Sequence, residues 1–233
     1  MNAPKYLALF DLDHTLLPLD SDYQWADFLA RTGRAGDPVA AQRLNEELME
    51  RYNQGSLTAE EAAEFMLGLL TRGEAHELTA WHQEFMQEIV QPALMAAAIE
   101  LVNHHQQQGH LCAIVTATNH FVTAPIAAAF GIEHLIATVP EQKEGRYTGK
   151  IHGVPSFQAG KITRVDQWLH DLGLRRDQFE RIWFYSDSPN DLPLLEVVSD
   201  PVATNPSPAL RDVALARGWQ VLDLFETMMD AKS

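Results

Sequence analysis

The sequence contains one cysteine, few basic residues and no long hydrophobic run. Of its 233 residues, 17 are Lys or Arg and 32 are Asp or Glu, which gives a formal net charge of −15. Nucleic acids and anionic membranes would repel such a chain, so we expect neither as a partner. Cys112 alone can form neither an internal disulfide nor a cysteine-based metal cluster. Nowhere do 18 apolar residues run together, so we expect no transmembrane helix.

We expect no signal peptide in the amino-terminal residues, because the apolar run after Lys5 is far too short for one. Together with the single cysteine, this favours a cytoplasmic protein. The length fits one α/β domain, or a core with a small insert.

The first apolar run, from Tyr6 to Phe10, predicts a short strand that is buried on both faces. Asp11 and Asp13 follow it directly, where an open α/β sheet has its ligand crevice. Two carboxylates this close repel each other, so either one is protonated or a metal ion lies between them. A plain Asx-rich turn would carry the same residues, but the rest of the chain favours a site.

Residues 18–91 are predicted to form a helical insert. The segment Asp20–Asp22 can begin a helix that carries Trp25, Phe28 and Leu29 on one face. Two more helices are expected to begin at Asp37-Pro38 and at the capping box Thr58–Glu61. A fourth amphipathic run stops before Pro92.

From Pro92 onward helices and strands alternate, which predicts a parallel sheet with right-handed crossovers. The expected strands are 111–115, 135–139, 182–185, 201–204 and 219–222, with a hairpin at 146–153. The expected helices are 92–108, 120–130, 158–172, 191–198 and 208–217. The fold class is therefore α/β, with a core of residues 1–17 and 92–233 and the helical insert of residues 18–91.

Further polar residues lie where these strands end or where the next helix begins. Thr116 follows one strand, Lys161 lies near the start of a helix, and Asp187, Asn190 and Asp191 follow another strand. Taken singly, such residues are usually helix caps or solvated charges. Their joint occurrence after Asp11 and Asp13 predicts a single site.

These residues resemble the motifs of the haloacid dehalogenase-like hydrolases, in particular the phosphoserine-phosphatase-like branch with a helical cap after the first strand. The stretch Asp11–Thr15 matches the first motif, DxDx[TV], and Thr116, Lys161 and Asp187–Asp191 match the second, third and fourth. The chain departs from the pattern at Ser186, where the fourth motif usually has Gly. It also has Thr-Ala-Thr where phosphoserine phosphatases usually have Ser-Gly-Gly.

The resemblance implies a Rossmann-like core and a Mg²⁺-dependent phosphomonoesterase. Asp11 would be the nucleophile that forms an aspartyl-phosphate, and Asp13 the general acid and base. The Asp11 and Asp187 carboxylates and the backbone carbonyl of Asp13 would hold Mg²⁺. Asp191 would not bind the metal directly but would accept a hydrogen bond from a metal-bound water and so orient it. The phosphate would bind to Thr116, Lys161 and Asn190.

Two other classes of protein stay open at this point. A receiver domain also uses an Asp, a Thr and a Lys to accept phosphate, but it is roughly half as long and lacks the Asp13 acid/base. A catalytically idle phosphate-binding protein on the same fold is the other. Ten histidines raise a zinc alternative, but His104 and His105 are adjacent, and adjacent helical residues do not share a face. We therefore expect both on the surface.

The substrate is expected to be a small phosphorylated metabolite, and the helical insert is expected to determine which one is bound. In phosphoserine phosphatases an acidic residue in the region of Asp20 meets the substrate ammonium, and a cap arginine meets its carboxylate. Asp20 can equally be a helix N-cap, and spacing fixes neither Arg43 nor Arg51 as the arginine. Acidic and aromatic residues favour an amine-bearing group, and the expected specificity residues are Asp20, Asp22, Trp25 and Arg51. The pattern is also similar to that of histidinol-phosphate phosphatases of histidine biosynthesis, so we expect histidinol phosphate, with phosphoserine as the alternative. The sequence predicts no oligomeric state.

Overall fold

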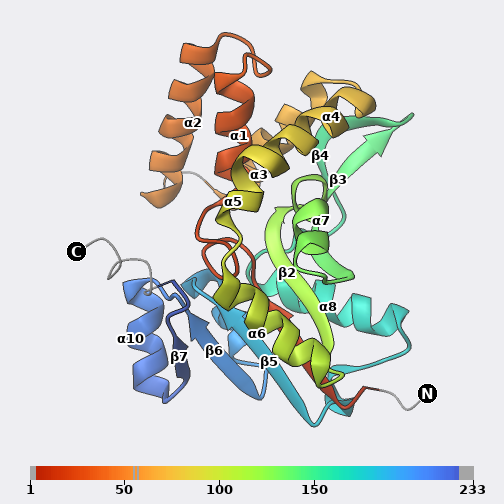
Figure 1. Cartoon of the computed structure of the whole chain (residues 1–233), viewed down its shortest axis with the longest axis vertical. Coiled ribbons are helices and arrows are strands. Elements are labelled where there is room, and N and C mark those ends of the chain that lie inside the picture. The colour runs from red at the N-terminus through yellow and green to blue at the C-terminus, as the bar shows by residue number, and fades with distance from the viewer. Residues whose placement is uncertain (1–3, 55, 57, 226–233) are drawn as a thin grey trace.

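A computed structural model of the chain describes residues 4–54, 56 and 58–225. Within these residues, seven strands form one sheet in the order β4-β3-β2-β1-β5-β6-β7 (Figure 1). β4 runs antiparallel to β3, and the other neighbouring strands are parallel. The strands are β1 (Tyr6–Phe10), β2 (Leu111–Asn119), β3 (His134–Lys143), β4 (Arg146–His152), β5 (Arg181–Ser186), β6 (Asp200–Thr204) and β7 (Gln220–Leu222). The mixed α/β fold class predicted from the alternating pattern is confirmed.

Helices connect these strands. Between β1 and β2 lie α1 (Ser21–Arg31), α2 (Pro38–Asn53), α3 (Ala59–Leu69), the 3-10 turn η1 (Leu70–Arg72), α4 (Ala75–Phe85), the π-helix η2 (Met86–Val90), α5 (Gln91–Ala93) and α6 (Ala96–Gln107). After β2 come α7 (His120–Ala129), α8 (Ala159–Asp171), the 3-10 turns η3 (Arg176–Gln178) and η4 (Pro189–Asp191), α9 (Leu192–Leu195) and α10 (Pro208–Arg217).

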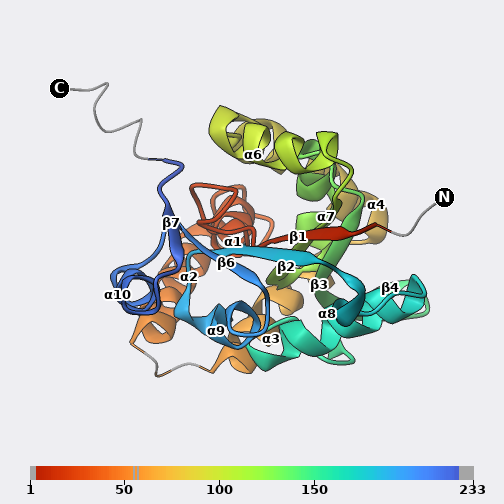
Figure 2. The same ribbon diagram turned by 90° about the horizontal axis from the view of Figure 1, so that it is seen from below.

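Helices cover both faces of the sheet. Because side chains alternate along a strand, each central strand contributes residues to the hydrophobic layers on both faces. In β1, Ala8 and Phe10 pack into the layer with α6 and α7, whereas Leu7 and Leu9 pack into the layer with α8, α9 and α10. Figure 2 shows these two layers on opposite sides of the sheet. All four side chains are fully buried, so β1 is a central strand and its carboxyl end is held in place from both sides.

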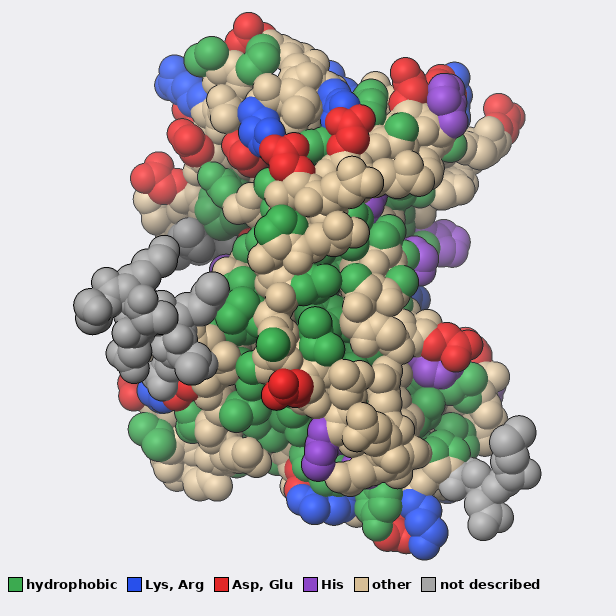
Figure 3. Space-filling model, in the orientation of Figure 1, with side chains coloured by type: hydrophobic (Ala, Val, Ile, Leu, Met, Phe, Trp, Pro, Cys, Tyr) green, Lys and Arg blue, Asp and Glu red, His purple; other side chains and the backbone are tan. Residues whose placement is uncertain are grey.

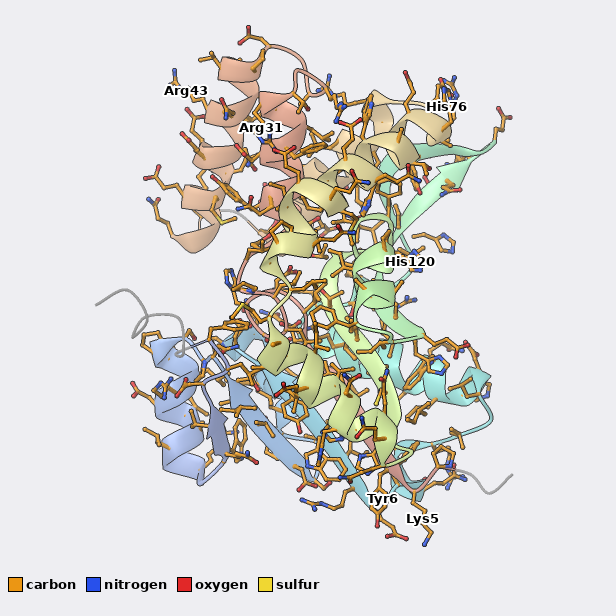
Figure 4. All side chains as sticks on the ribbon, in the orientation of Figure 1. Lys5, Tyr6, Arg31, Arg43, His76 and His120 are labelled. Atoms are coloured by element: carbon orange, nitrogen blue, oxygen red, sulfur yellow. The ribbon has the colours of Figure 1, made fainter. Side chains whose placement is uncertain are left out.

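The helical insert lies beyond the carboxyl end of β1. Lys5 and Tyr6, at the start of β1, are at the opposite end of the molecule from α1 to α4 (Figure 4). The predicted helix starts are confirmed: Asp20 is the N-cap of α1, and Thr58 and Glu61 form the capping box of α3. Trp25 of α1 belongs to the same hydrophobic cluster as Phe10 of β1. The hydrophobic core of the insert is therefore continuous with the layer between the sheet and helices α6 and α7.

Several predicted boundaries are wrong. The helical stretch does not stop before Pro92 but continues through it to Ala93. It does so through a π-turn, in which the Gln91 N–H donates to the Met86 carbonyl, and Pro92 then falls in the first turn of α5, where a missing N–H costs little. α6 consequently begins at Ala96 and not at Pro92. The helix expected over 191–198 is shorter, with α9 ending at Leu195.

The two adjacent histidines differ from the prediction that both lie on the surface. His104 is exposed, but His105 is buried, with 3% of its surface exposed. Its Nε2 lies 2.7 Å from the Tyr185 hydroxyl, and its Nδ1 lies 2.8 Å from Nδ1 of His110. Because adjacent helical residues point in different directions, one of the two faces the sheet.

Charged and hydrophobic side chains are distributed unevenly over the surface. On the face shown in Figure 3, hydrophobic side chains gather over the middle of the molecule, between charged groups on the upper helices and at the lower end. No single helix in the described part of the chain is long and apolar enough to span a membrane. The helical segments Ala75–Ala93 and Ala96–Gln107 meet the length and composition criteria only when taken together, across a bend of 92°.

Candidate active site

Asp11 lies directly after β1, and its backbone and both carboxylate oxygens have partners. Its N–H donates to the Tyr185 carbonyl at 2.9 Å, which continues the pairing of β1 with β5 past the last strand residue. Oδ1 accepts from Lys161 Nζ at 2.7 Å and Oδ2 accepts from Thr15 Oγ1 at 3.2 Å. The chain turns sharply after Asp11, with three successive N–H groups, those of Thr15, Leu16 and Leu17, donating to the Leu12 carbonyl.

Lys161, in the first turn of α8, lies between two carboxylates. Its Nζ is 2.7 Å from Asp11 Oδ1 and 2.7 Å from Asp191 Oδ2, and the residue is 2% exposed. Burial on its own would lower the pKa of Lys161, but the charges of Asp11 and Asp191 raise it above its ordinary value. Burial raises the pKa of Asp191 to about 6, against the opposing effect of Lys161. Lys161 is therefore charged and cannot leave the site without exposing two buried carboxylates to each other.

Asp13 is held by two hydrogen bonds. Its Oδ1 accepts from the Ser21 N–H at 2.7 Å and its Oδ2 from the Thr118 hydroxyl at 2.8 Å. Burial and the nearby charge of Asp20 raise the pKa of Asp13 to about 6, although both hydrogen bonds oppose this shift. A carboxyl group with such a pKa can both give and take a proton near neutral pH.

Asp11 and Asp187 meet at one hydroxyl group. Thr15 Oγ1 lies 3.2 Å from Asp11 Oδ2 and 3.3 Å from Asp187 Oδ1, and it accepts from the Asp187 N–H at 3.1 Å. One hydroxyl proton can serve only one carboxylate at a time. Burial and the charges of Asp11 and Asp191 raise the pKa of Asp187 to about 8. Lys161 opposes this shift but does not cancel it, so Asp187 lies in a predominantly negative environment.

This donor set suits Mg²⁺, which prefers carboxylate, carbonyl and water oxygens. In the described residues no three His, Cys, Asp or Glu side chains come together as a metal site. A cation held by Asp11 and Asp187 would therefore need further oxygen ligands. The backbone carbonyl of Asp13 and water molecules are the ligands that the sequence predicts.

Thr116 lies within β2 and does not follow the strand as predicted. β2 continues past Val115 to Asn119 with a register shift against β3, and α7 begins only at His120. Thr116 Oγ1 accepts from the Thr118 N–H at 3.2 Å. Asn119 is the N-cap of α7, and its side-chain amide donates to Asp22 Oδ1 at 3.0 Å. The end of β2 thus contacts both the acid/base candidate and the helical insert.

The loop after β5 carries the fourth motif. The Ser186 hydroxyl, which replaces the usual glycine, donates to Asp191 Oδ2 at 2.7 Å. Asp191 thereby has two partners, Ser186 and Lys161, and is 2% exposed. Asn190 lies in the short turn η4 and lines the same cavity as Asp187.

The predicted residues of the helical insert divide into two groups. Asp20 and Asp22 line a cavity of about 650 Å³ that also reaches Asp11, Lys161 and Thr116. Asp20 also caps α1 by accepting from the Tyr23 N–H at 2.8 Å, so the two roles considered for it coexist. Burial raises the pKa values of both Asp20 and Asp22.

The structure does not bring Trp25 and Arg51 to this cavity. Trp25 is fully buried among the rings of Phe28, His82, Phe85 and Phe121, since it lies on the inward face of α1. Arg51, near the end of α2, is exposed and absent from the described lining. Arg43 points outward from α2 (Figure 4) and pairs with Glu47 at 2.7 Å.

Sequence reasoning missed several residues that hold the site together. Thr15 is part of the first motif, but the motif assigns it no contact, and the sequence predicts no role for Ser186, Thr118 or Asn119. The only signal in the sequence was their position beside motif residues. Their hydrogen bonds depend on how the turns after β1, β2 and β5 face one another.

The fold and this site define a class of protein. Residues 8–196 match the family model of the haloacid dehalogenase-like hydrolases, and the chain belongs to that family. It is a phosphatase of the family, and the phosphatase names of its relatives disfavour the receiver-like and idle alternatives. A histidinol-phosphatase of Neisseria meningitidis serogroup C (strain 8013) is 40% identical over 220 residues, which are 94% of this chain and 99% of the relative.

Two solved structures have the same fold. A protein of unknown function from Bordetella pertussis Tohama I is 64% identical, with a TM-score of 0.94 over 96% of this chain and 100% of the other. A substrate-bound phosphoserine phosphatase has a TM-score of 0.67 over 95% of this chain and 94% of the other. At 17% identity, the second likeness concerns the fold alone.

Proposed function

We propose that this phosphatase hydrolyses small phosphomonoesters in a Mg²⁺-dependent reaction that passes through an aspartyl-phosphate on Asp11. The observation that carries the proposal is the environment of Asp11. Its carboxylate lines the cavity while Lys161 Nζ and Thr15 Oγ1 fix its two oxygens at 2.7 and 3.2 Å. A carboxylate oriented in this way can attack phosphorus in line with the leaving oxygen.

The reaction balances in two steps. First, an Asp11 oxygen bonds to phosphorus, the bond from phosphorus to the ester oxygen breaks, and Asp13 donates its proton to the leaving alcohol. Second, Asp13 takes a proton from water as the water oxygen attacks phosphorus, and the bond to Asp11 breaks to release phosphate. Ser21 and Thr118 hold the Asp13 carboxyl group on both sides during these transfers.

Other residues neutralise and orient the phosphoryl group. Mg²⁺ bound by Asp11, Asp187 and the backbone carbonyl of Asp13 would supply charge neutralisation when present. Lys161 adds a fixed positive charge, which Asp191 holds in place at 2.7 Å. Asp191 would also orient a water on the metal. Thr116 and Asn190, which line the cavity, would donate hydrogen bonds to phosphoryl oxygens.

We also propose that residues 18–91 act as a cap over a core of residues 1–17 and 92–233. In support, α2 and α3 of the insert line the same cavity as the catalytic aspartates. The helical insert can therefore limit access of water and select the substrate.

The proposed substrate is an amine-bearing phosphomonoester, histidinol phosphate in particular, which would place the enzyme in histidine biosynthesis in the cytoplasm. Asp20 and Asp22 line the cavity and would attract an ammonium group. The name of the Neisseria relative, which aligns over 99% of its length, supports the same substrate. Phosphoserine, the alternative, also carries an amine, but its carboxylate would face the same two acidic residues.

The test measures phosphate release by the purified protein from histidinol phosphate, phosphoserine and glycerol phosphate, with Mg²⁺ and with EDTA. We expect the highest kcat/KM for histidinol phosphate and no turnover in EDTA. The Asp20→Asn variant should narrow the preference for histidinol phosphate over glycerol phosphate. A wild type that prefers glycerol phosphate would contradict the amine proposal.

A further inference from the structure

The helical insert presents four carboxyl groups and one amide to the cavity. Its polar lining residues are Asp20, Asp22, Asn45, Glu60 and Glu64, and among the described residues it contributes no Lys, Arg or His to the lining. Such a wall favours a ligand that carries N–H donors and disfavours one that carries a carboxylate.

Asn45 of α2 has a buried oxygen that lacks a partner. The residue is 2% exposed, and its side-chain amide donates to the Tyr23 carbonyl at 3.3 Å. Its Oδ1 accepts no hydrogen bond from any described residue. Buried acceptors are almost always paired in native structures. Because Asn45 lines the cavity, a ligand N–H is a suitable partner for this oxygen.

Glu60 and Glu64 lie one turn apart on α3, on the same cavity. Like charges at this spacing repel each other and destabilise a helix. Neither forms an ion pair with another described residue. A cationic ligand group between them would relieve the repulsion.

Cations in the cavity come from the core. Lys161 is committed to Asp11 and Asp191, at the phosphate end. Lys150 of β4 is exposed and lines the cavity, as does His14 of the loop after β1. The wall formed by α2 and α3 itself supplies no cationic side chain to a substrate carboxylate. Met49, Phe65 and Met66 line the same wall and give a planar apolar group a surface to pack on.

We propose that Asn45, Glu60 and Glu64 form a second subsite, which binds a nitrogen-bearing group distant from the phosphate. This inference rests on the proposed function and defines its substrate class more closely. The substrate is a phosphomonoester with two separate N–H donor groups, an amine and a nitrogen heterocycle such as imidazole, and no carboxylate. The amine faces Asp20 and Asp22, and the heterocycle faces α2 and α3.

The kinetic test compares histidinol phosphate, which has both donor groups, with p-nitrophenyl phosphate, which has neither. The readout is the ratio of the two kcat/KM values. Glu64→Gln keeps the shape of an exposed side chain and should lower this ratio at least about fivefold, as expected for loss of a charge-assisted hydrogen bond. Asn45→Leu should lower it further. Glu46→Gln changes an exposed charge outside the cavity lining and should leave the ratio unchanged.

A binding measurement separates this inference from the proposed function. Calorimetric titration with histidinol, which lacks the phosphate, reports the donor subsites without any hydrolysis. If histidinol binds the wild type and Glu64→Gln weakens that binding, the subsite stands even if no phosphate ester is hydrolysed. The subsite is overturned if the wild type does not bind histidinol. It is overturned equally if Glu64→Gln changes neither the Kd nor the kinetic ratio in a protein that hydrolyses p-nitrophenyl phosphate.

Discussion

His105 should make the folding of this protein depend on pH. The side chain lies on α6 against the sheet and contacts Tyr185 at 2.7 Å and His110 at 2.8 Å. The rings of Phe10 and Trp183 pack against it. Burial, and then the nearby charges of His110 and His104, lower the pKa of His105 from its ordinary value of 6.5 to about 4. The folded protein therefore keeps His105 neutral over a range in which the unfolded chain protonates it.

The magnitude follows from the two pKa values. Between about pH 6.5 and pH 4 the unfolded state binds the proton and the folded state does not, so the stability of the fold decreases as the pH falls through this window. At about 1.4 kcal/mol per pKa unit, the full loss is about 3 kcal/mol. At pH 5 the expected loss is about 2 kcal/mol relative to pH 7.

The assay is urea unfolding at pH 7 and pH 5, in EDTA, for the wild type and for His105→Gln. Glutamine can form hydrogen bonds to Tyr185 and His110 but does not titrate. The wild type should lose about 2 kcal/mol more than the variant between the two pH values. His76→Gln is the matched control, because it makes the same replacement at an exposed histidine of α4 that is not among the groups acting on His105. Equal losses in the wild type and in His105→Gln would refute the reasoning.

Three further predictions concern the site. Asp13→Asn should slow hydrolysis of alkyl phosphates far more than that of p-nitrophenyl phosphate, whose leaving group needs little protonation; equal slowing would remove Asp13 from the acid role. Asp187→Asn should shift the Mg²⁺ activation curve to higher concentration, and full wild-type activity in EDTA would contradict the metal site. Gly160→Ala places a Cβ atom 2.2 Å from the Pro155 carbonyl oxygen, next to Lys161, and should lower both Tm and kcat. Gly68→Ala, whose Cβ atom would have no neighbour within 4 Å, should lower neither.

Much of the fold can be predicted from short sequence signals, such as apolar runs and helix caps. The continuous apolar run Tyr6–Phe10 predicts a central strand because both of its faces are buried, and the structure confirms this. The caps Asp20 and Thr58 determine where α1 and α3 begin, because they satisfy backbone N–H groups within a few residues. Such signals act over one helical turn, which is why they can be read from the sequence.

Other features depended on contacts between distant segments. Pro92 predicts a helix end because it has no backbone N–H to donate. The π-turn before it places Pro92 in the first turn of α5, where this N–H is not needed. Trp25 is predicted to contact the substrate because aromatic side chains often line binding sites. The face of α1 on which it lies instead packs against α4 and α7. Asn45, Glu60 and Glu64 belong to no motif, and only the packing of α2 and α3 over the site brings them to the cavity. The roles of Asp11, Asp13 and the metal ligands stay predictions.

The central claim is that Asp11 carries the phosphoryl group, and a trapping experiment tests it most directly. Wild-type protein and Asp11→Asn are mixed with substrate and Mg²⁺, quenched in acid within the first turnover, digested and examined by mass spectrometry. We expect a phosphoryl group on the wild-type peptide that contains Asp11 and none on the variant, whose kcat should fall by about 10³-fold or more. A phosphoryl group on another residue, or an Asp11→Asn variant that retains more than about a hundredth of the wild-type kcat, would contradict the account.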